Sequence, residues 1–129
     1  MHVAVVCTAL LGLLVFGLGL GVSTLRGSTN TVFGYKPDPT DRLCKMVRAH
    51  GNAAEYAPML AVLILFLGVL RQPPAWVVWT FVIATVSRYL HAAGMIFPAT
   101  LATPHPLRFV GALGTYLAGL ALVVATLMA

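Results

Sequence analysis

The chain is short, strongly apolar and basic: its 129 residues are 60% hydrophobic and only 9% charged, with a formal net charge of +5. Soluble domains carry roughly 25% charged residues, so this composition excludes an ordinary soluble domain and predicts one all-α integral membrane domain over residues 1–129. The basic residues punctuate apolar runs and do not cluster with aromatic side chains, which argues against a nucleic-acid surface.

The first apolar run predicts a membrane-spanning helix over about residues 3–25. The run is almost wholly apolar or small, and it is long enough to cross ~30 Å of hydrocarbon. No positive residue precedes it and no convincing cleavage site follows it, which argues against a secretory signal peptide. Arg26 closes this helix, and the polar connection that follows ends at Thr40 or Asp41, either of which can cap the next helix.

The second helix, predicted over residues 42–70, carries the most informative stretch of the chain. Arg48, Asn52 and Glu55 recur at i, i+4 and i+7, so they form one polar stripe within an apolar span. Glu55 is the only acid in any apolar segment, and an ionisable group inside a bilayer usually faces protein or a water-filled site. Pro58 removes one backbone hydrogen bond in this helix and predicts a kink just beyond Glu55.

Two further helices are predicted over about residues 75–97 and 107–128, which gives a four-transmembrane-helix bundle. In the third helix, Arg88 and His91 lie one turn apart and form a second polar stripe. A rise of ~1.5 Å per residue places Glu55 at a depth of ~18 Å and Arg88 at ~14 Å. Either charge alone would be costly in hydrocarbon, so we hypothesise that Glu55 and Arg88 form an ion pair.

The basic residues near the helix ends predict the orientation. The first and third connections carry Arg26, Lys36, Arg42, Lys45, Arg48 and Arg108, whereas the second connection carries only Arg71. By the positive-inside rule, the first and third connections face the cytoplasm and both termini lie on the opposite side. The cysteines fall at opposite membrane faces and predict no disulfide, and the scattered histidines predict no metal site.

Several features together resemble one protein family. The stretch Arg48-Ala-His-Gly-Asn-Ala-Ala-Glu-Tyr-Ala-Pro58 resembles the second-helix signature of the MAPEG family, the membrane-associated proteins of eicosanoid and glutathione metabolism. Arg88-x-x-His91 in the third helix, Arg108 at the start of the fourth helix and the order of the four spans resemble the same family, especially its small bacterial members. The resemblance implies a homotrimer in a bacterial inner membrane, with three sites between neighbouring subunits that hold glutathione near the cytoplasmic face.

Individual residues take roles toward glutathione under this resemblance. Arg108 is the expected catalytic residue, because its match in the family stabilises the glutathione thiolate. Arg48 would hold a carboxylate, Asn52 would pair with the peptide backbone, and Glu55 would accept the ammonium group. The other residues assigned to the site are Tyr56, Arg88, His91 and Arg26.

The implied activity is glutathione transfer to lipophilic electrophiles that arrive through the membrane, a detoxification reaction, and the same thiolate is suited to reducing lipid hydroperoxides. Gly51 and Met95 depart from the pattern, because some family members have a basic residue and a tyrosine at these positions. Two alternatives therefore stay open. One is a non-catalytic, lipid-binding member of the same family, and the other is a small transporter, in which the buried Glu55 would have to change its protonation.

Overall fold

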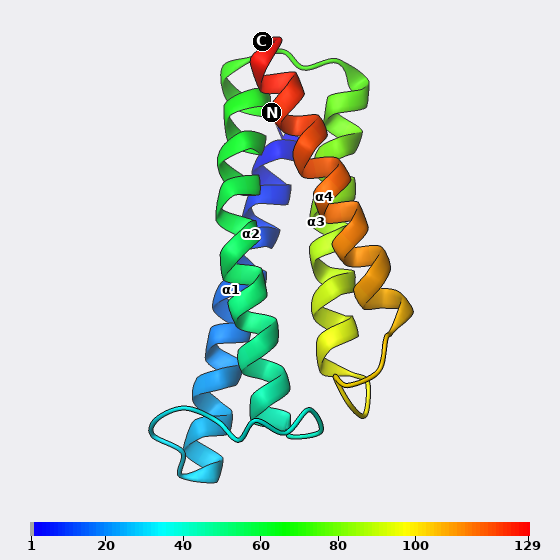
Figure 1. The fold of residues 1–129 in the computed structure, drawn as a ribbon. Coiled ribbons are helices and arrows are strands. Elements are labelled where there is room, and N and C mark those ends of the chain that lie inside the picture. The colour runs from blue at the N-terminus through cyan, green and yellow to red at the C-terminus, as the bar shows by residue number, and fades with distance from the viewer. Residues whose placement is uncertain (1) are drawn as a thin grey trace.

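The structure is a bundle of four antiparallel helices. The computed structural model describes residues 2–129 and contains, with no strand in that range, α1 (His2–Thr29), α2 (Arg42–Leu70), α3 (Ala75–Ile96) and α4 (Pro106–Leu127). The α1–α2 and α3–α4 connections lie at one end of the bundle, and the α2–α3 connection lies at the other end with the two chain ends (Figure 1). The predicted all-α, four-helix architecture is confirmed.

The four helices differ in how apolar they are. Within residues 2–129, three helices, α1, α2 and α4, are long and apolar enough to cross a bilayer. The helix α3 is as long as α4, with 22 residues each, but it is richer in buried polar side chains, which are Thr80, Thr85, Ser87, Arg88 and His91. Because these side chains face protein, the polar content of α3 does not have to meet lipid.

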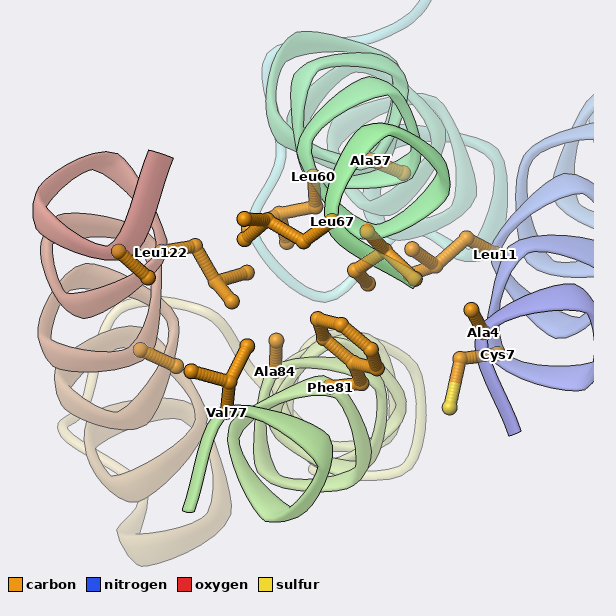
Figure 2. Close-up of a cluster of buried hydrophobic side chains, with 13 residues drawn as sticks. Ala4, Cys7, Leu11, Ala57, Leu60, Leu67, Val77, Phe81, Ala84 and Leu122 are labelled. Atoms are coloured by element: carbon orange, nitrogen blue, oxygen red, sulfur yellow. The ribbon is translucent and has the colours of Figure 1, made fainter. Parts of the chain in front are cut away.

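The helices pack through stripes of small and branched apolar side chains. The larger core cluster joins all four helices (Figure 2) and consists of Ala4, Cys7 and Leu11 on α1, Ala57, Leu60, Ile64 and Leu67 on α2, Val77, Phe81 and Ala84 on α3, and Ala118, Leu122 and Ala125 on α4. Along each of the four helices these positions recur every three or four residues, which defines one face of a helix. Lipid tails are as apolar as these side chains, so the contacts stabilise the bundle mainly through van der Waals packing.

The C-terminal end of α1 differs from the sequence-based expectation. The helix runs past Arg26, which was predicted to close it, and ends at Thr29. Asn30 adopts the left-handed conformation with φ of 51°, and the Thr31 N–H donates a hydrogen bond to the Arg26 carbonyl at 3.0 Å. This is the Schellman arrangement that ends many helices. The Arg26 guanidinium also donates to the Gly34 carbonyl at 2.7 Å, so it stabilises the turn beyond the helix.

The N-terminal end of α2 agrees with the prediction. Asp41 is the N-cap, and its carboxylate accepts a hydrogen bond from the Cys44 N–H at 2.8 Å. Just before it, the backbone N–H and then the hydroxyl of Thr40 donate to Asp38, which holds the pKa of that exposed carboxyl below its usual value. Cys44 and Cys7 are buried free thiols, as expected for cysteines that form no disulfide.

Candidate functional site

A polar cavity is lined by α2, α3 and α4 at the end of the bundle that holds the α1–α2 and α3–α4 connections. Its volume is about 460 Å³, and both connections contribute to its wall. Five residues that the sequence analysis assigned to a site line it, namely Arg48, Asn52, Glu55, His91 and Arg108. The fold therefore gathers side chains from three helices into one space.

The small residues of α2 direct its polar stripe toward this cavity. Ala49, Ala53 and Ala57 recur every four residues and are buried, with exposed fractions of 1%, 0% and 1%. They belong to the core clusters that join α2 to its neighbours. The polar stripe occupies a different face of the same helix, so Arg48 and Glu55 remain exposed in the single chain and the cavity is open beside them.

Arg88 is the largest fully buried side chain, with 1% exposed, but it does not pair with Glu55. Its Nη2 donates to the Asn52 Oδ1 at 2.6 Å and its Nη1 donates to the Thr115 hydroxyl at 3.4 Å. The guanidinium carbon also lies 5.3 Å from the centre of the Tyr56 ring. The predicted Glu55–Arg88 ion pair is wrong for the described chain, because Asn52, one turn earlier, turns toward Arg88 while Glu55 lines the open side of the cavity.

Arg108 reaches the cavity from the first turn of α4. Its Nη1 donates to the Leu101 carbonyl at 3.3 Å and its Nη2 donates to the Thr103 carbonyl at 2.7 Å, so the α3–α4 connection holds the guanidinium in place. α3 approaches closely at this point, because a Cβ on Gly94 would lie 2.8 Å from the Arg108 Cα. A guanidinium has more N–H donors than these two bonds use, so Arg108 is a fixed cation with donors left for an anionic ligand.

His91 lies on the cavity wall and is 7% exposed. Its Nδ1 has no hydrogen-bond partner among the residues that the structure describes. The backbone of His91 packs against Gly111 on α4, where a Cβ would come within 2.7 Å of the His91 Cα. His91 therefore contributes to the cavity wall while its Nδ1 stays buried.

Three predicted site residues do not line the polar cavity of the single chain: Arg88, whose contacts are described above, Arg26 and Tyr56. Arg26 lies beside a separate cavity that includes Ser23 and Asn30, and its guanidinium binds backbone carbonyls of the turn. Tyr56 faces α4, and its hydroxyl lies 3.4 Å from the Tyr116 hydroxyl. The roles of Arg26 and Tyr56 toward glutathione stay predictions.

Two residues on the cavity wall, Tyr35 and Leu101, come from the connections and were not predicted. The connections are tied to each other and to α2, because the Leu101 N–H donates to the Pro39 carbonyl and the Lys45 Nζ donates to the Pro98 carbonyl, both at 2.9 Å. Neither Tyr35 nor Leu101 belongs to a periodic pattern, so the sequence carried no signal for them.

A second space, the α2–α4 groove, has a volume of about 480 Å³ and is mostly apolar. Its wall includes Met59, Leu63, Tyr56 and Tyr116. Glu55 lines both this groove and the polar cavity, so the two spaces are neighbours at this residue.

Almost the whole chain matches one known protein family. A sequence profile of the MAPEG family matches residues 4–128. The chain belongs to the MAPEG family. MAPEG proteins are membrane proteins and include glutathione transferases and peroxidases as well as non-enzymes, and the apolar helices agree with a membrane location. No significant match was found among curated proteins or among solved structures.

The polar cavity of this MAPEG protein combines positive, negative and neutral hydrogen-bonding side chains. Within residues 2–129, no three His, Cys, Asp or Glu side chains lie close enough together to hold a metal. The cavity wall instead combines two guanidinium groups, one carboxylate, one amide and one imidazole, from Arg48, Arg108, Glu55, Asn52 and His91.

Proposed function

We propose that this MAPEG protein is a membrane-bound glutathione transferase that binds glutathione in the polar cavity. Glutathione carries two carboxylates, one ammonium group, peptide amides and one thiol. The observation that carries the proposal is the matching set of groups on one wall: Arg48 and Arg108 for anions, Glu55 for the ammonium and Asn52 for an amide. The cavity volume of about 460 Å³ falls within the ~300–1,000 Å³ of typical small-molecule sites.

Arg108 is the residue that we assign to activation of the thiol. A cysteine-like thiol has a pKa of ~8.5, and lowering that pKa by ~2 units requires about 2.7 kcal/mol of preferential stabilisation of the thiolate. One hydrogen bond to a charged group contributes ~1.5–3 kcal/mol, which is of the required size. The two bonds from Arg108 to loop carbonyls support this role, because they orient the guanidinium before the ligand arrives.

The α2–α4 groove is the site that we assign to the lipophilic electrophile. It is lined mainly by apolar side chains and is a neighbour of the polar cavity at Glu55. A hydrophobic compound dissolved in the bilayer would therefore reach the thiolate without crossing water. A lipid hydroperoxide that entered the same groove would be reduced by the same thiolate.

We further propose that the working form is a homotrimer with glutathione sites between neighbouring subunits. Arg48 and Glu55 are exposed in the single chain, which is costly for charged groups at membrane depth unless a second subunit or a ligand covers them. Val32 and Phe33 in the α1–α2 connection are 96% and 95% exposed, which supports contact with a neighbour or with lipid. In this proposal the cavity faces the cytoplasm of a bacterial inner membrane, and both termini face the other side.

A non-catalytic, lipid-binding role is the second candidate. Gly51 and Met95 both line the polar cavity and contribute no polar side-chain group to it, so the wall holds fewer contacts for glutathione than it would with a basic residue and a tyrosine. In that case the α2–α4 groove would bind lipid and the polar cavity would bind glutathione weakly or not at all.

Calorimetric titration of the detergent-solubilised protein with glutathione tests the proposal. We expect binding in the wild-type protein, and a thiolate absorbance that appears well below pH 8.5, at least ~1 unit lower than for free glutathione. In Arg108→Ala we expect glutathione still to bind while the thiolate pKa returns toward ~8.5. The matched control is Arg42→Ala, which removes an exposed cation that lies in the same helix as Arg48 but does not line the cavity.

Absence of binding to the wild-type protein at millimolar glutathione would remove the enzyme proposal and favour the lipid-binding role. A thiolate signal unchanged in Arg108→Ala would remove Arg108 as the activating residue.

A further inference from the structure

The α2–α4 groove contains a pair of tyrosine hydroxyl groups in an otherwise apolar wall. The hydroxyls of Tyr56 and Tyr116 lie 3.4 Å apart, and the two rings meet edge to face with their centres 5.7 Å apart. Tyr116 is half exposed to the groove, with 50% of its surface accessible. At 3.4 Å the contact between the hydroxyls is long for an O–H···O hydrogen bond, which prefers ~2.7–2.8 Å. Both hydroxyls therefore have unused capacity to bind a third oxygen atom.

The positive charge of Arg88 lies next to this pair. The Arg88 guanidinium carbon is 5.3 Å from the centre of the Tyr56 ring, and its Nη1 lies 3.4 Å from the hydroxyl of Thr115, the neighbour of Tyr116 on α4. The hydrogen bonds of Arg88 go to neutral groups in the described chain. A buried cation in a low-dielectric interior favours negative charge that develops nearby.

Glu55 is the one acidic side chain that lines the groove, and its charge would oppose a developing anion. In the proposed function, the ammonium group of glutathione neutralises this carboxylate from the side of the polar cavity. This ion pair would weaken the repulsion between Glu55 and an anion that develops at the tyrosine pair.

From this geometry we infer that Tyr116 is a catalytic residue of the proposed transferase, and that its hydroxyl donates a hydrogen bond to the carbonyl oxygen of an α,β-unsaturated ketone or aldehyde bound in the α2–α4 groove. The inference rests on the proposed function and names its substrate class. Tyr56 is the positioning residue, because its hydroxyl and ring hold Tyr116 in place from α2.

The reaction would be a conjugate addition. The glutathione sulfur forms a bond to the β-carbon of the substrate, the carbon–carbon π bond breaks, and its electron pair moves to give an enolate whose oxygen accepts the hydrogen bond from Tyr116. The α-carbon then takes up a proton from solvent. Because the thiol releases one proton on activation and the product gains one, atoms and charge balance without an oxidant or reductant.

The test compares Tyr116→Phe with the wild-type protein on two electrophiles of similar size in the presence of saturating glutathione. One is trans-4-phenyl-3-buten-2-one, whose transition state carries negative charge on oxygen, and the other is phenethyl bromide, which has no oxygen. We expect kcat/KM for the enone to fall about tenfold to a hundredfold, as when one donor to a developing oxyanion is removed. The rate with phenethyl bromide and the affinity for glutathione should change less than about twofold.

Tyr89→Phe is the matched control, because it also removes one phenolic hydroxyl but from the side of α3 that bonds the Leu10 carbonyl of α1. It should leave the ratio of the two rates unchanged. Equal losses with both electrophiles in Tyr116→Phe, or no loss with the enone, would overturn the inference while the transferase function stands.

A second readout does not depend on turnover. The infrared band of 4-phenylbutan-2-one, an unreactive saturated ketone labelled with ¹³C at its carbonyl, should shift to lower frequency when the ketone binds the wild-type protein and should lose that shift in Tyr116→Phe. If neither electrophile reacts but the shift is seen, the hydroxyl site stands and the transferase proposal fails. If the band of the bound ketone is the same in both proteins, the inference is wrong.

Discussion

At the scale of single residues, Arg88 shows how neutral groups stabilise a charge inside this bundle. The side chain is 1% exposed, and its hydrogen bonds go to the amide oxygen of Asn52 and the hydroxyl of Thr115. An ionised group in a membrane interior normally pairs with an opposite charge. Here the hydrogen-bond partners are two neutral dipoles and the ring of Tyr56 lies beside the guanidinium, so among the described residues no carboxylate is hydrogen-bonded to Arg88.

Replacing Asn52 tests this description. In Asn52→Ala the 2.6 Å acceptor of the Arg88 Nη2 is lost, and we expect the free energy of unfolding to fall by about 2 kcal/mol, the size of a hydrogen bond to a charged group. Asn52→Asp keeps an acceptor oxygen at the same place, so it should lose much less stability. The measurement is unfolding of detergent-solubilised protein by sodium dodecyl sulfate, without glutathione. Equal destabilisation in both variants would show that the contact with Arg88 does not contribute.

The sequence predicted site residues only where polar side chains recur along one face of a helix. Arg48, Asn52 and Glu55 share one helical stripe, and the structure places all of them on the polar cavity. The Glu55–Arg88 pair was wrong, because depth along a helix determines height in the membrane but not the direction in which a side chain points. Tyr116 was missed for a related reason: a lone tyrosine on an apolar helix belongs to no pattern until its partner on α2 is known.

At the scale of the helices, the α3–α4 contact is the closest one near the site. Three glycines allow it: a Cβ on Gly94 or Gly111 would meet backbone atoms of the facing helix, and a Cβ on Gly114 would meet the Ser87 side chain. Small residues let membrane helices approach so that van der Waals contacts and hydrogen bonds between them become strong. This approach sets the relative positions of His91 and Arg108 on the two helices.

We expect Gly111→Ala to push the two helices apart, because its methyl group would lie 2.7 Å from the Cα of His91. Overpacking of this kind costs ~1–3 kcal/mol, and glutathione affinity should fall as well, because His91 and Arg108 would separate. The matched control is Gly12→Ala on α1, where no atom other than those of its chain neighbours and the surrounding α1 backbone lies within 4 Å of the new methyl group. Thermal unfolding and glutathione calorimetry on both variants check this, and a Gly111→Ala protein as stable as Gly12→Ala would contradict it.

Helix boundaries were predictable where the sequence contains a local signal. Asp41 marks the start of α2 because its side chain can cap free N–H groups. Pro74 and Pro106 mark the starts of α3 and α4, because a proline lacks the N–H that would be unpaired there. The observed starts agree. The end of α1 was not predictable in this way, because it depends on Asn30 adopting a positive φ of 51°, which Asn adopts only in some contexts. Pro58 lies inside α2, which continues through it, and the predicted kink stays a prediction.

At the scale of the whole molecule, the polar cavity lies at one end of an otherwise apolar bundle. The α1–α2 and α3–α4 connections are tied together there by the bond from the Leu101 N–H to the Pro39 carbonyl, and the polar cavity opens beside them. The α2–α4 groove extends from this end along the apolar part of the helices. A water-soluble thiol and a membrane-soluble electrophile would thus approach Glu55 from different media.

The proposed trimer gives Arg26 a role that a single chain does not. In one chain, Arg26 lies apart from the polar cavity, so it can contact glutathione only if it reaches the site of a neighbouring subunit. We therefore expect Arg26→Ala and Arg108→Ala to be weakly active when each is expressed alone. Co-expressed in equal amounts, the two variants should regain about a quarter of the wild-type activity. In a ring of subunits each site would combine Arg26 of one chain with Arg108 of the next chain. If the two variants mix at random, about one site in four receives both arginines intact.

The co-expressed protein must be compared with the two variants purified separately and mixed in detergent, where subunits that do not exchange should show no recovery. Activity that stays at the level of the single variants after co-expression would mean that Arg26 and Arg108 do not act on one site from different chains. Full activity of Arg26→Ala alone would leave Arg26 with only its role at the end of α1, where its guanidinium holds the carbonyls of Thr31 and Gly34.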